Sequence, residues 1–305
     1  MAHIAQKIFI GADGGGTKTK VQVEDENGKI LGTGKSGPGN IRTSVDLAWN
    51  SIYSGLKEAL LQAGLKLEDP NYEYHAGLGL AGYEVPEAVK DFLRKPHPFK
   101  TISLESDAII ACLGAHAGQD GAIIIVGTGV HGCEVFKGKI IHVGGWGFPH
   151  GDEGGGAWLG MEAVRLTLKS IDGRSYATSI CEAVLEKFDN NVTALVTWAV
   201  QARPGDFGTL APLVIEHAAL GDTHAMMLLD MAASEIDLIA EALDDAIDGN
   251  DLSLTLFGGI APHLKSRLSP EIQARLVERR FDATRGAIFL ARQKVLGENW
   301  KKGIV

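Results

Sequence analysis

An aspartate, three glycines and a threonine, Asp13 to Thr17, stand between two β-like runs of the sequence. Glycines let backbone N–H groups point into a turn without steric cost, and such a turn can bind an anion. Thr17 and Lys18 add a hydroxyl and a cation, and Asp13 could hold Mg²⁺, through water, because that ion keeps much of its hydration. A flexible hairpin turn with solvated lysines explains the same residues equally well.

Two further glycine turns have the same ambiguity. Gly127, Thr128 and Gly129 follow the apolar run at 121–126, so that each half of the chain opens with a strand and a glycine–threonine turn. Two such turns could hold a polyphosphate from opposite sides, although an ordinary hairpin accounts for either one alone. Gly258 and Gly259 separate a predicted strand from a predicted helix, where a flat base could approach the bare backbone or where the chain merely turns tightly.

Three acidic residues and one aromatic residue suggest a site for a hydroxyl-bearing ligand. Asp107 begins a predicted helix after the strand at 101–106; its carboxylate could accept a proton from an incoming hydroxyl, or it could be the N-cap of the helix. Trp146, Asp152 and Glu153 lie in a glycine-rich loop, where a flat ring beside carboxylates suits the apolar faces and hydroxyl edges of a sugar. In the alternative interpretation, these two acids only favour the positive end of the next helix.

Apolar periodicity predicts the elements that must position these residues. Expected strands cover 8–11, 19–24, 29–34, 72–82 and 101–106, and expected helices cover 44–65, 85–95 and a segment from 107. The second half repeats the three-strand pattern over 121–145. After it we expect a helix-rich region at 157–247, which includes a long helix at 223–247, then a strand at 252–259 and a helix at 282–296. We therefore predict an α/β fold of two mixed halves.

Composition limits the possible functions. A net charge of −9 argues against a nucleic-acid or anionic-membrane partner, and 45% hydrophobic content over 305 residues is enough for two cores. The cysteines, Cys112, Cys133 and Cys181, are few and far apart, so neither disulfides nor a zinc or iron–sulfur site is expected. No signal-like or membrane-spanning apolar run is seen, which favours a soluble, cytoplasmic protein.

Other motifs are weak or absent. Among 39 glycines the pattern GxGxxG occurs at 32–37, 77–82 and 127–132, which shows how little it discriminates, and no Walker A loop is present. The spacing of His131, His142 and His150 fits no common metal site, so we expect these side chains to be solvated or hydrogen-bonded. The pair Met226 and Met227 is expected in the core.

The segments "GADGGGTKT", "GPGN", "LESDA", "VGTG", "GGWGFPHGDEGGG" and "LFGGIA", in this order, resemble the N-acetylglucosamine kinase and glucosamine kinase group. That group belongs to the BadF/BadG/BcrA/BcrD ATPase-like proteins of the sugar kinase–Hsp70–actin superfamily. The resemblance spans roughly residues 8–290. It implies two RNase H-like, actin-like ATPase domains, which we assign to 1–116 and 117–305, with ATP in the interdomain cleft and the C-terminal helix packed back on the first domain.

The resemblance also assigns roles to residues. It implies ATP-dependent phosphorylation of the 6-hydroxyl of N-acetylglucosamine or glucosamine by a cytoplasmic homodimer, with Mg²⁺ at Asp13 and Asp107 as the general base. The implied phosphate and nucleotide contacts are Gly14, Gly15, Gly16, Thr17, Lys18, Gly127, Thr128, Gly129, Gly258 and Gly259. The implied sugar contacts are Asn40, Asp107, Gly145, Trp146, Gly147 and Asp152. Which of the two amino sugars is preferred stays open.

Two other functions remain as alternatives. An activator ATPase of the CoA-dehydratase type shares the implied fold but needs cysteines that bind a cluster at a dimer interface, and the three cysteines here lack clustered spacing. A nucleotide-dependent binding module without catalysis is the second alternative.

Overall fold

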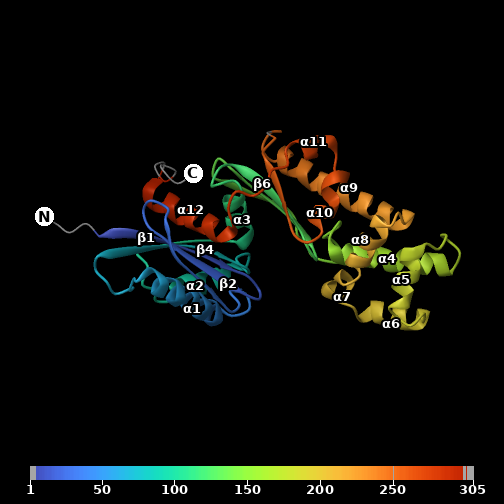
Figure 1. Cartoon of the computed structure of the whole chain (residues 1–305), viewed down its shortest axis with the longest axis horizontal. Helices are drawn as coiled ribbons and strands as arrows, with labels where there is room; N and C mark the ends of the chain where they lie inside the picture. The colour runs from blue at the N-terminus through green and yellow to red at the C-terminus, as the bar shows by residue number, and fades with distance from the viewer. Residues whose placement is uncertain (1–4, 250, 298–299, 301–305) are drawn as a thin grey trace. The chain divides into compact units, whose positions relative to one another are not determined.

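The computed structural model describes residues 5–249, 251–297 and 300, and they form two compact units (Figure 1). The first unit takes its described residues from 1–121, 135–140 and 278–305, and the second comprises 122–134 and 141–277. The domain ranges 1–116 and 117–305 stay a prediction. Within the described ranges, no helix has the length and apolar character needed to cross a bilayer.

The first unit contains a mixed sheet with helices on both faces. Its elements are β1 (Gln6–Gly14), β2 (Thr19–Glu24), β3 (Ile30–Ser36), α1 (Val45–Ala63), β4 (Tyr72–Leu80), α2 (Pro86–Arg94), β5 (Thr101–Glu105), α3 (Asp107–Ala115) and α12 (Ala283–Leu296). The strand order is β3-β2-β1-β4-β5. In Figure 1, α1 and α2 lie on one face of this sheet, and α3 and α12 lie on the other.

The register of this sheet brings three strand ends to one edge. β1 pairs with β4 in parallel, with Gly11 opposite Gly77, and β4 pairs with β5 in parallel, with Gly77 opposite Ser103. β2 runs antiparallel to β1, with Asp13 opposite Lys20. Because the carboxyl ends of parallel strands point the same way, the residues that follow β1, β4 and β5 share one edge of the sheet.

The C-terminal helix α12 lies directly on β1 and β4 because glycines leave room for its backbone. A Cβ atom at Gly11 would stand 2.2 Å from the Thr284 carbonyl oxygen, and one at Gly77 would stand 1.8 Å from the carbonyl oxygen of Ala287. Gly286, on α12 itself, faces α3 in the same way, since its Cβ would lie 1.9 Å from the Ile110 oxygen. No side chain larger than hydrogen fits at these crossings.

A buried arginine fastens α12 to the turn after β2. Arg292 is fully buried, and its guanidinium lies 4.2 Å from the ring centre of Phe9 and 3.5 Å from the Glu24 carboxylate. It also donates a hydrogen bond to the carbonyl of Glu26 at 3.0 Å. Burial raises the pKa of Glu24 and lowers the pKa of Arg292, because both charges have left water. The pairing offsets this desolvation only while both partners are present.

Except for Gly121 and residues 135–140, which belong to the first unit, a smaller sheet and a helical region form the second unit. Its elements are β6 (Gly121–Val126), β7 (Val130–Phe136), β8 (Lys139–Gly144), α4 (Gly156–Ile171), α5 (Ser179–Glu186), α6 (Val192–Gln201), α7 (Pro204–Gly208), α8 (Ala211–Ala219), α9 (Thr223–Asp245), β9 (Leu254–Phe257), α10 (Ala261–Leu264), the 3₁₀ turn η1 (Lys265–Arg267) and α11 (Pro270–Ala274). The strand order is β8-β7-β6-β9. β6 and β9 are parallel, with Ile125 opposite Phe257, so the turns that follow them meet at one edge.

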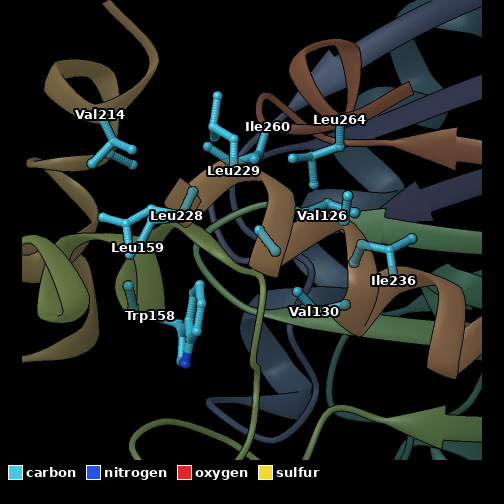
Figure 2. Packing of buried hydrophobic residues seen from close by; sticks show 14 of the residues in the cluster. Val126, Val130, Trp158, Leu159, Val214, Leu228, Leu229, Ile236, Ile260 and Leu264 are labelled. Carbon is cyan, nitrogen blue, oxygen red and sulfur yellow. The ribbon is translucent and has the colours of Figure 1, made fainter. Parts of the chain in front are cut away.

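One apolar core joins this sheet to the helices. Figure 2 shows Val126 and Val130 of the strands together with Ile236 of α9, and Leu159 of α4 beside Leu228. All five side chains are buried. The core therefore fixes the ends of β6 and β7, and the turn between them, relative to α4 and α9.

The predicted fold class is confirmed, including the three-strand pattern that opens each half. Two local predictions were wrong. Ser106, not Asp107, is the N-cap of α3, because its hydroxyl accepts the hydrogen bond from the Ile109 N–H and Asp107 is already helical. Met226 and Met227 lie on the outer side of α9, with 38% and 41% of their surface exposed, while Leu228 and Leu229 fill the core.

Replacement of Arg292 by leucine should lower the free energy of unfolding by about 3 kcal/mol, because Glu24 loses a buried cation partner. The neighbouring Arg285, 3.6 Å from Glu24, limits the loss. The exposed Arg174, paired with Asp172 on the surface, supplies the control Arg174→Leu, which should leave the urea midpoint unchanged. Equal midpoints for the two variants would contradict a structural role of the buried pair.

Candidate functional site

The three glycines of the first hairpin have different roles. A Cβ at Gly14 would lie 2.6 Å from a Leu80 side-chain atom and 3.2 Å from Gly39, so Gly14 is required by packing. A Cβ at Gly15 would make an ordinary contact, 3.7 Å from the Lys18 oxygen. At Gly16 a Cβ would meet nothing within 4 Å, and this residue is exposed together with Thr17 and Lys18. The hairpin tip therefore offers open backbone, which is what a phosphate group needs.

Backbone hydrogen bonds hold the hairpin against two neighbouring segments. The N–H of Gly39 donates to the Gly15 carbonyl at 2.8 Å, and the N–H of Ala81, just after β4, donates to the Gly14 carbonyl at 2.9 Å. Asn40 adjoins the same place: its side-chain oxygen accepts from the Thr43 N–H at 3.2 Å. The structure thus brings Asn40 and the hairpin, which are far apart in sequence, to one edge of the first sheet.

Asp107 lies at the same edge, in the first turn of α3. Its carboxylate accepts a hydrogen bond from the Ala108 N–H at 3.0 Å and is half-buried. Burial raises the pKa of Asp107, the Ala108 bond lowers it, and the nearby Glu84 raises it again. A carboxylate with a raised pKa is a stronger base.

Asp13, at the end of β1, is coupled to Asp107. Burial, and then the charge of Asp107, raise the pKa of Asp13 to about 6, although Lys20 acts in the opposite direction. Partly desolvated carboxylates with excess negative charge fit a hard cation such as Mg²⁺, whose preferred ligands are oxygens. Among the residues that the structure describes, no cluster of three or more His, Cys, Asp or Glu side chains could hold a metal ion. Mg²⁺ tolerates such a sparse set, because water and phosphate oxygens complete its shell.

In the second unit the Gly127–Gly129 turn is built onto α4. The first N–H groups of that helix, from Gly156 and Ala157, donate to the carbonyls of Gly127 and Thr128 at 2.8 and 2.9 Å. The turn after β9 packs beside it: Gly258 has a φ of +99°, and its Cβ would lie 2.1 Å from the Val126 oxygen. Only glycine satisfies both conditions at Gly258.

A cavity of about 530 Å³ opens at these two turns. It is lined by Gly127, Thr128, Gly156, Gly208, Ala211, Pro212, Ile215, Glu216, Gly259, Ile260 and His263. At Gly127 and Gly259 a Cβ would meet nothing within 4 Å, so bare backbone faces open space there. A largely apolar cavity with a few polar groups and a glycine-rich margin suits a flat base with phosphates attached.

The loop predicted to bind sugar lines a second cavity in the second unit. A cavity of about 200 Å³ is lined in part by Gly144, Trp146 and Asp152, and Trp146 is 83% exposed. Asp152 has a φ of +64°, and its carboxylate packs against Gly129, where a Cβ would stand 2.3 Å from Oδ2. The acid predicted to bind sugar therefore touches the turn predicted to bind phosphate.

Several residues of these sites were missed by sequence reasoning. The cavity wall at Ala211, Ile215, Glu216 and His263 comes from α8 and α10, whose sequences look like ordinary amphipathic helices. Glu84, which acts on Asp107, follows β4 without any motif. Only the parallel register of the strands and the packing of the helices reveal them.

The raised pKa of Asp13 predicts a pH-dependent stability. The unfolded carboxyl has a pKa of 3.8 and the folded one about 6, so the folded state binds its proton more tightly. Asp13 therefore destabilises the fold as pH rises from about 4 to 6, by about 3 kcal/mol above pH 6. Asp13→Asn should be more stable than the parent at pH 7.5 and nearly equal at pH 4, in urea unfolding without metal. The same difference at both pH values would contradict this assignment.

Comparison with known proteins identifies relatives over most of the chain. The model of the BadF/BadG/BcrA/BcrD ATPase family matches residues 10–291. A glucosamine kinase of Vibrio cholerae serotype O1 is 37% identical over 284 residues, which is 93% of this chain and 95% of the relative. An N-acetyl-D-glucosamine kinase of Dictyostelium discoideum is 32% identical, with 77% of this chain and 79% of the relative covered.

A solved structure agrees with these relatives. A candidate N-acetylglucosamine kinase from Chromobacterium violaceum superimposes with a TM-score of 0.78 at 35% identity, over 95% of this chain and 99% of that one. The resemblance to the N-acetylglucosamine and glucosamine kinase group is confirmed at the level of sequence and fold. The chain belongs to the BadF/BadG/BcrA/BcrD ATPase family.

Proposed function

We propose that the protein is an ATP-dependent hexosamine kinase that phosphorylates the 6-hydroxyl of glucosamine or N-acetylglucosamine. The observation that carries this proposal is the coupling of Asp13 and Asp107 beside the open hairpin at one edge of the first sheet. One carboxylate is available for a cation and the other for a hydroxyl proton. The names of the relatives, a glucosamine kinase and an N-acetyl-D-glucosamine kinase, supply the substrate class.

In this proposal Asp107 is the general base. It orients the sugar hydroxyl and takes its proton as the oxygen attacks the γ-phosphorus of ATP. The raised pKa of Asp107, caused first by burial, strengthens it as a proton acceptor. Because Ser106 caps α3, the Asp107 side chain is not needed for capping.

The glycine turns bind the phosphates of ATP in this proposal. The hairpin tip at Gly16–Lys18 and the turn residues Thr128 and Gly129 donate backbone N–H groups, since those of Gly15 and Gly127 already donate to the carbonyls of Lys18 and Gly129. The base occupies the cavity beside Gly258 and Gly259. Asp13 would hold Mg²⁺ through water, and that ion, when bound, would offset charge on the phosphoryl groups. Asn40, Gly145, Trp146, Gly147 and Asp152 are the proposed sugar contacts, with the exposed Trp146 ring available to an apolar sugar face.

The cysteines give no support to the activator-type alternative. Cys112, Cys133 and Cys181 are all buried and form no disulfide, whereas a cluster shared at a dimer interface needs thiolates at the surface. A homodimer, expected only from the family resemblance, stays a prediction.

Release of ADP from Mg-ATP, measured with glucosamine, N-acetylglucosamine, glucose or no sugar, tests the proposed function. At least one amino sugar should raise the rate at least tenfold over the sugar-free background, because the bound hydroxyl completes the reacting pair. A rate that no sugar raises would refute the kinase proposal. Sugar-independent hydrolysis with stoichiometric iron would favour the activator type, and nucleotide binding without turnover would favour a binding module.

Replacement of Asp107 by asparagine tests the general base. Asparagine keeps the shape and the Ala108 hydrogen bond but cannot accept a proton, so kcat should fall at least a hundredfold while the KM for ATP stays within about threefold. Glu84→Gln, which removes a neighbouring charge without removing the base, is the matched variant and should keep most of the activity. Near-normal turnover of Asp107→Asn would remove Asp107 from this role.

A further inference from the structure

A histidine of β7 lies directly under the glycine-rich loop that carries the proposed sugar contacts. His131 comes two residues after Gly129, and its ring is half-buried. The ring faces Gly145, since a Cβ there would stand 2.6 Å from His131 Nδ1. Gly145 also has a φ of +73°. Gly145 therefore excludes a side chain for two reasons, its backbone conformation and the imidazole beneath it.

Two hydrogen bonds fix the orientation of this ring. His131 Nε2 lies 3.1 Å from His142 Nδ1 on the neighbouring strand β8. The other ring nitrogen, Nδ1, is left for the hydrogen bond to the backbone of Gly144. This bond raises the pKa of His131, so the ring is the donor and the Gly144 carbonyl is the acceptor. Burial, and then His142, lower the pKa of His131, which favours the neutral ring. A neutral ring that donates through Nδ1 must accept through Nε2, so His142 Nδ1–H is the donor of the second bond.

The loop above the ring begins with a run rich in glycine. Gly144, Gly145 and Gly147 all have positive φ, at +72°, +73° and +91°, and a Cβ at Gly147 would meet nothing within 4 Å. Glycines in succession cost much conformational entropy when they are ordered. A hydrogen bond to the Gly144 carbonyl at the start of this run limits the freedom of the residues that follow. Asp152 lies within electrostatic reach of the same ring.

We propose that His131 is a positioning residue for the hexosamine site: its Nδ1–H holds the Gly144 carbonyl, and His142 fixes the tautomer that makes this possible. Through these two bonds the ring orders the Gly145–Gly147 backbone and Trp146 for the sugar, without contacting ATP. This inference rests on the proposed function for the identity of the ligand, but the ordering of the loop can be measured without any substrate.

Hydrogen–deuterium exchange of peptides covering 142–150 tests the ordering. His131→Leu, which has similar volume and no donor, should speed exchange of the loop amides about five- to tenfold, the effect of losing one hydrogen bond. His131→Asn should exchange like the parent, because the asparagine amide nitrogen replaces Nδ1 as donor. Unchanged exchange in His131→Leu, or equal acceleration in both variants, would overturn the proposal.

Kinetics then test the link to the sugar. His131→Leu should raise the KM for the amino sugar about tenfold and leave the KM for ATP within twofold, and His131→Asn should restore the sugar KM. The exposed His142→Phe, which removes only the tautomer-fixing bond, should raise the sugar KM about threefold. Equal increases in both KM values would show general damage and overturn the proposal. If the parent shows no sugar-dependent turnover, the proposed function fails by itself, and the exchange result still decides the role of His131.

Discussion

The close contact of α12 with the first sheet is the constraint on which the proposed contacts of the first unit depend. Helix and strand backbones meet where Gly11 and Gly77 lack side chains, and Gly286 allows the same approach to α3. Helix α12 therefore fixes β1, β4 and α3 relative to one another, and the elements that it joins carry Asp13, Ala81 and Asp107 at their ends. The buried pair of Arg292 and Glu24 holds the other end of the helix. Because protein interiors are packed as densely as crystals, a displacement of α12 would also displace the strands that it contacts.

Glycines in this protein divide into those that packing requires and those that face open space. Gly14 and Gly258 belong to the first kind, since a Cβ at either would strike a neighbour. Gly16, Gly127 and Gly259 belong to the second, and each stands next to a glycine or threonine turn predicted to bind nucleotide. The packing glycines hold each turn in place, and the open ones leave room for a ligand beside the backbone, although the Gly127 N–H itself donates to the Gly129 carbonyl.

The second unit organises its own proposed contacts through a single turn. The carbonyls of Gly127 and Thr128 receive the first N–H groups of α4, and Asp152 packs on Gly129. The proposed phosphate and sugar contacts of this unit thus share one rigid support. Beneath the predicted sugar loop, His131 and His142 complete the support with side-chain hydrogen bonds, as expected for hydrogen-bonded histidines.

The sequence by itself determined the elements and the chemical groups. Short-range signals, such as the apolar periodicity of β2 and α1, predicted element types and most boundaries, and the order of glycine and acidic motifs predicted the family. Only the tertiary structure decided which groups meet. The raised pKa of Asp13 needs burial and then Asp107 beside it, the proposed nucleotide cavity needs α8 and α10, and the proposed role of His131 needs β8. Met226 and Met227 were wrongly predicted to be buried for the same reason. The sequence of a helix shows its apolar period but not which elements pack against each face, and burial depends on that packing.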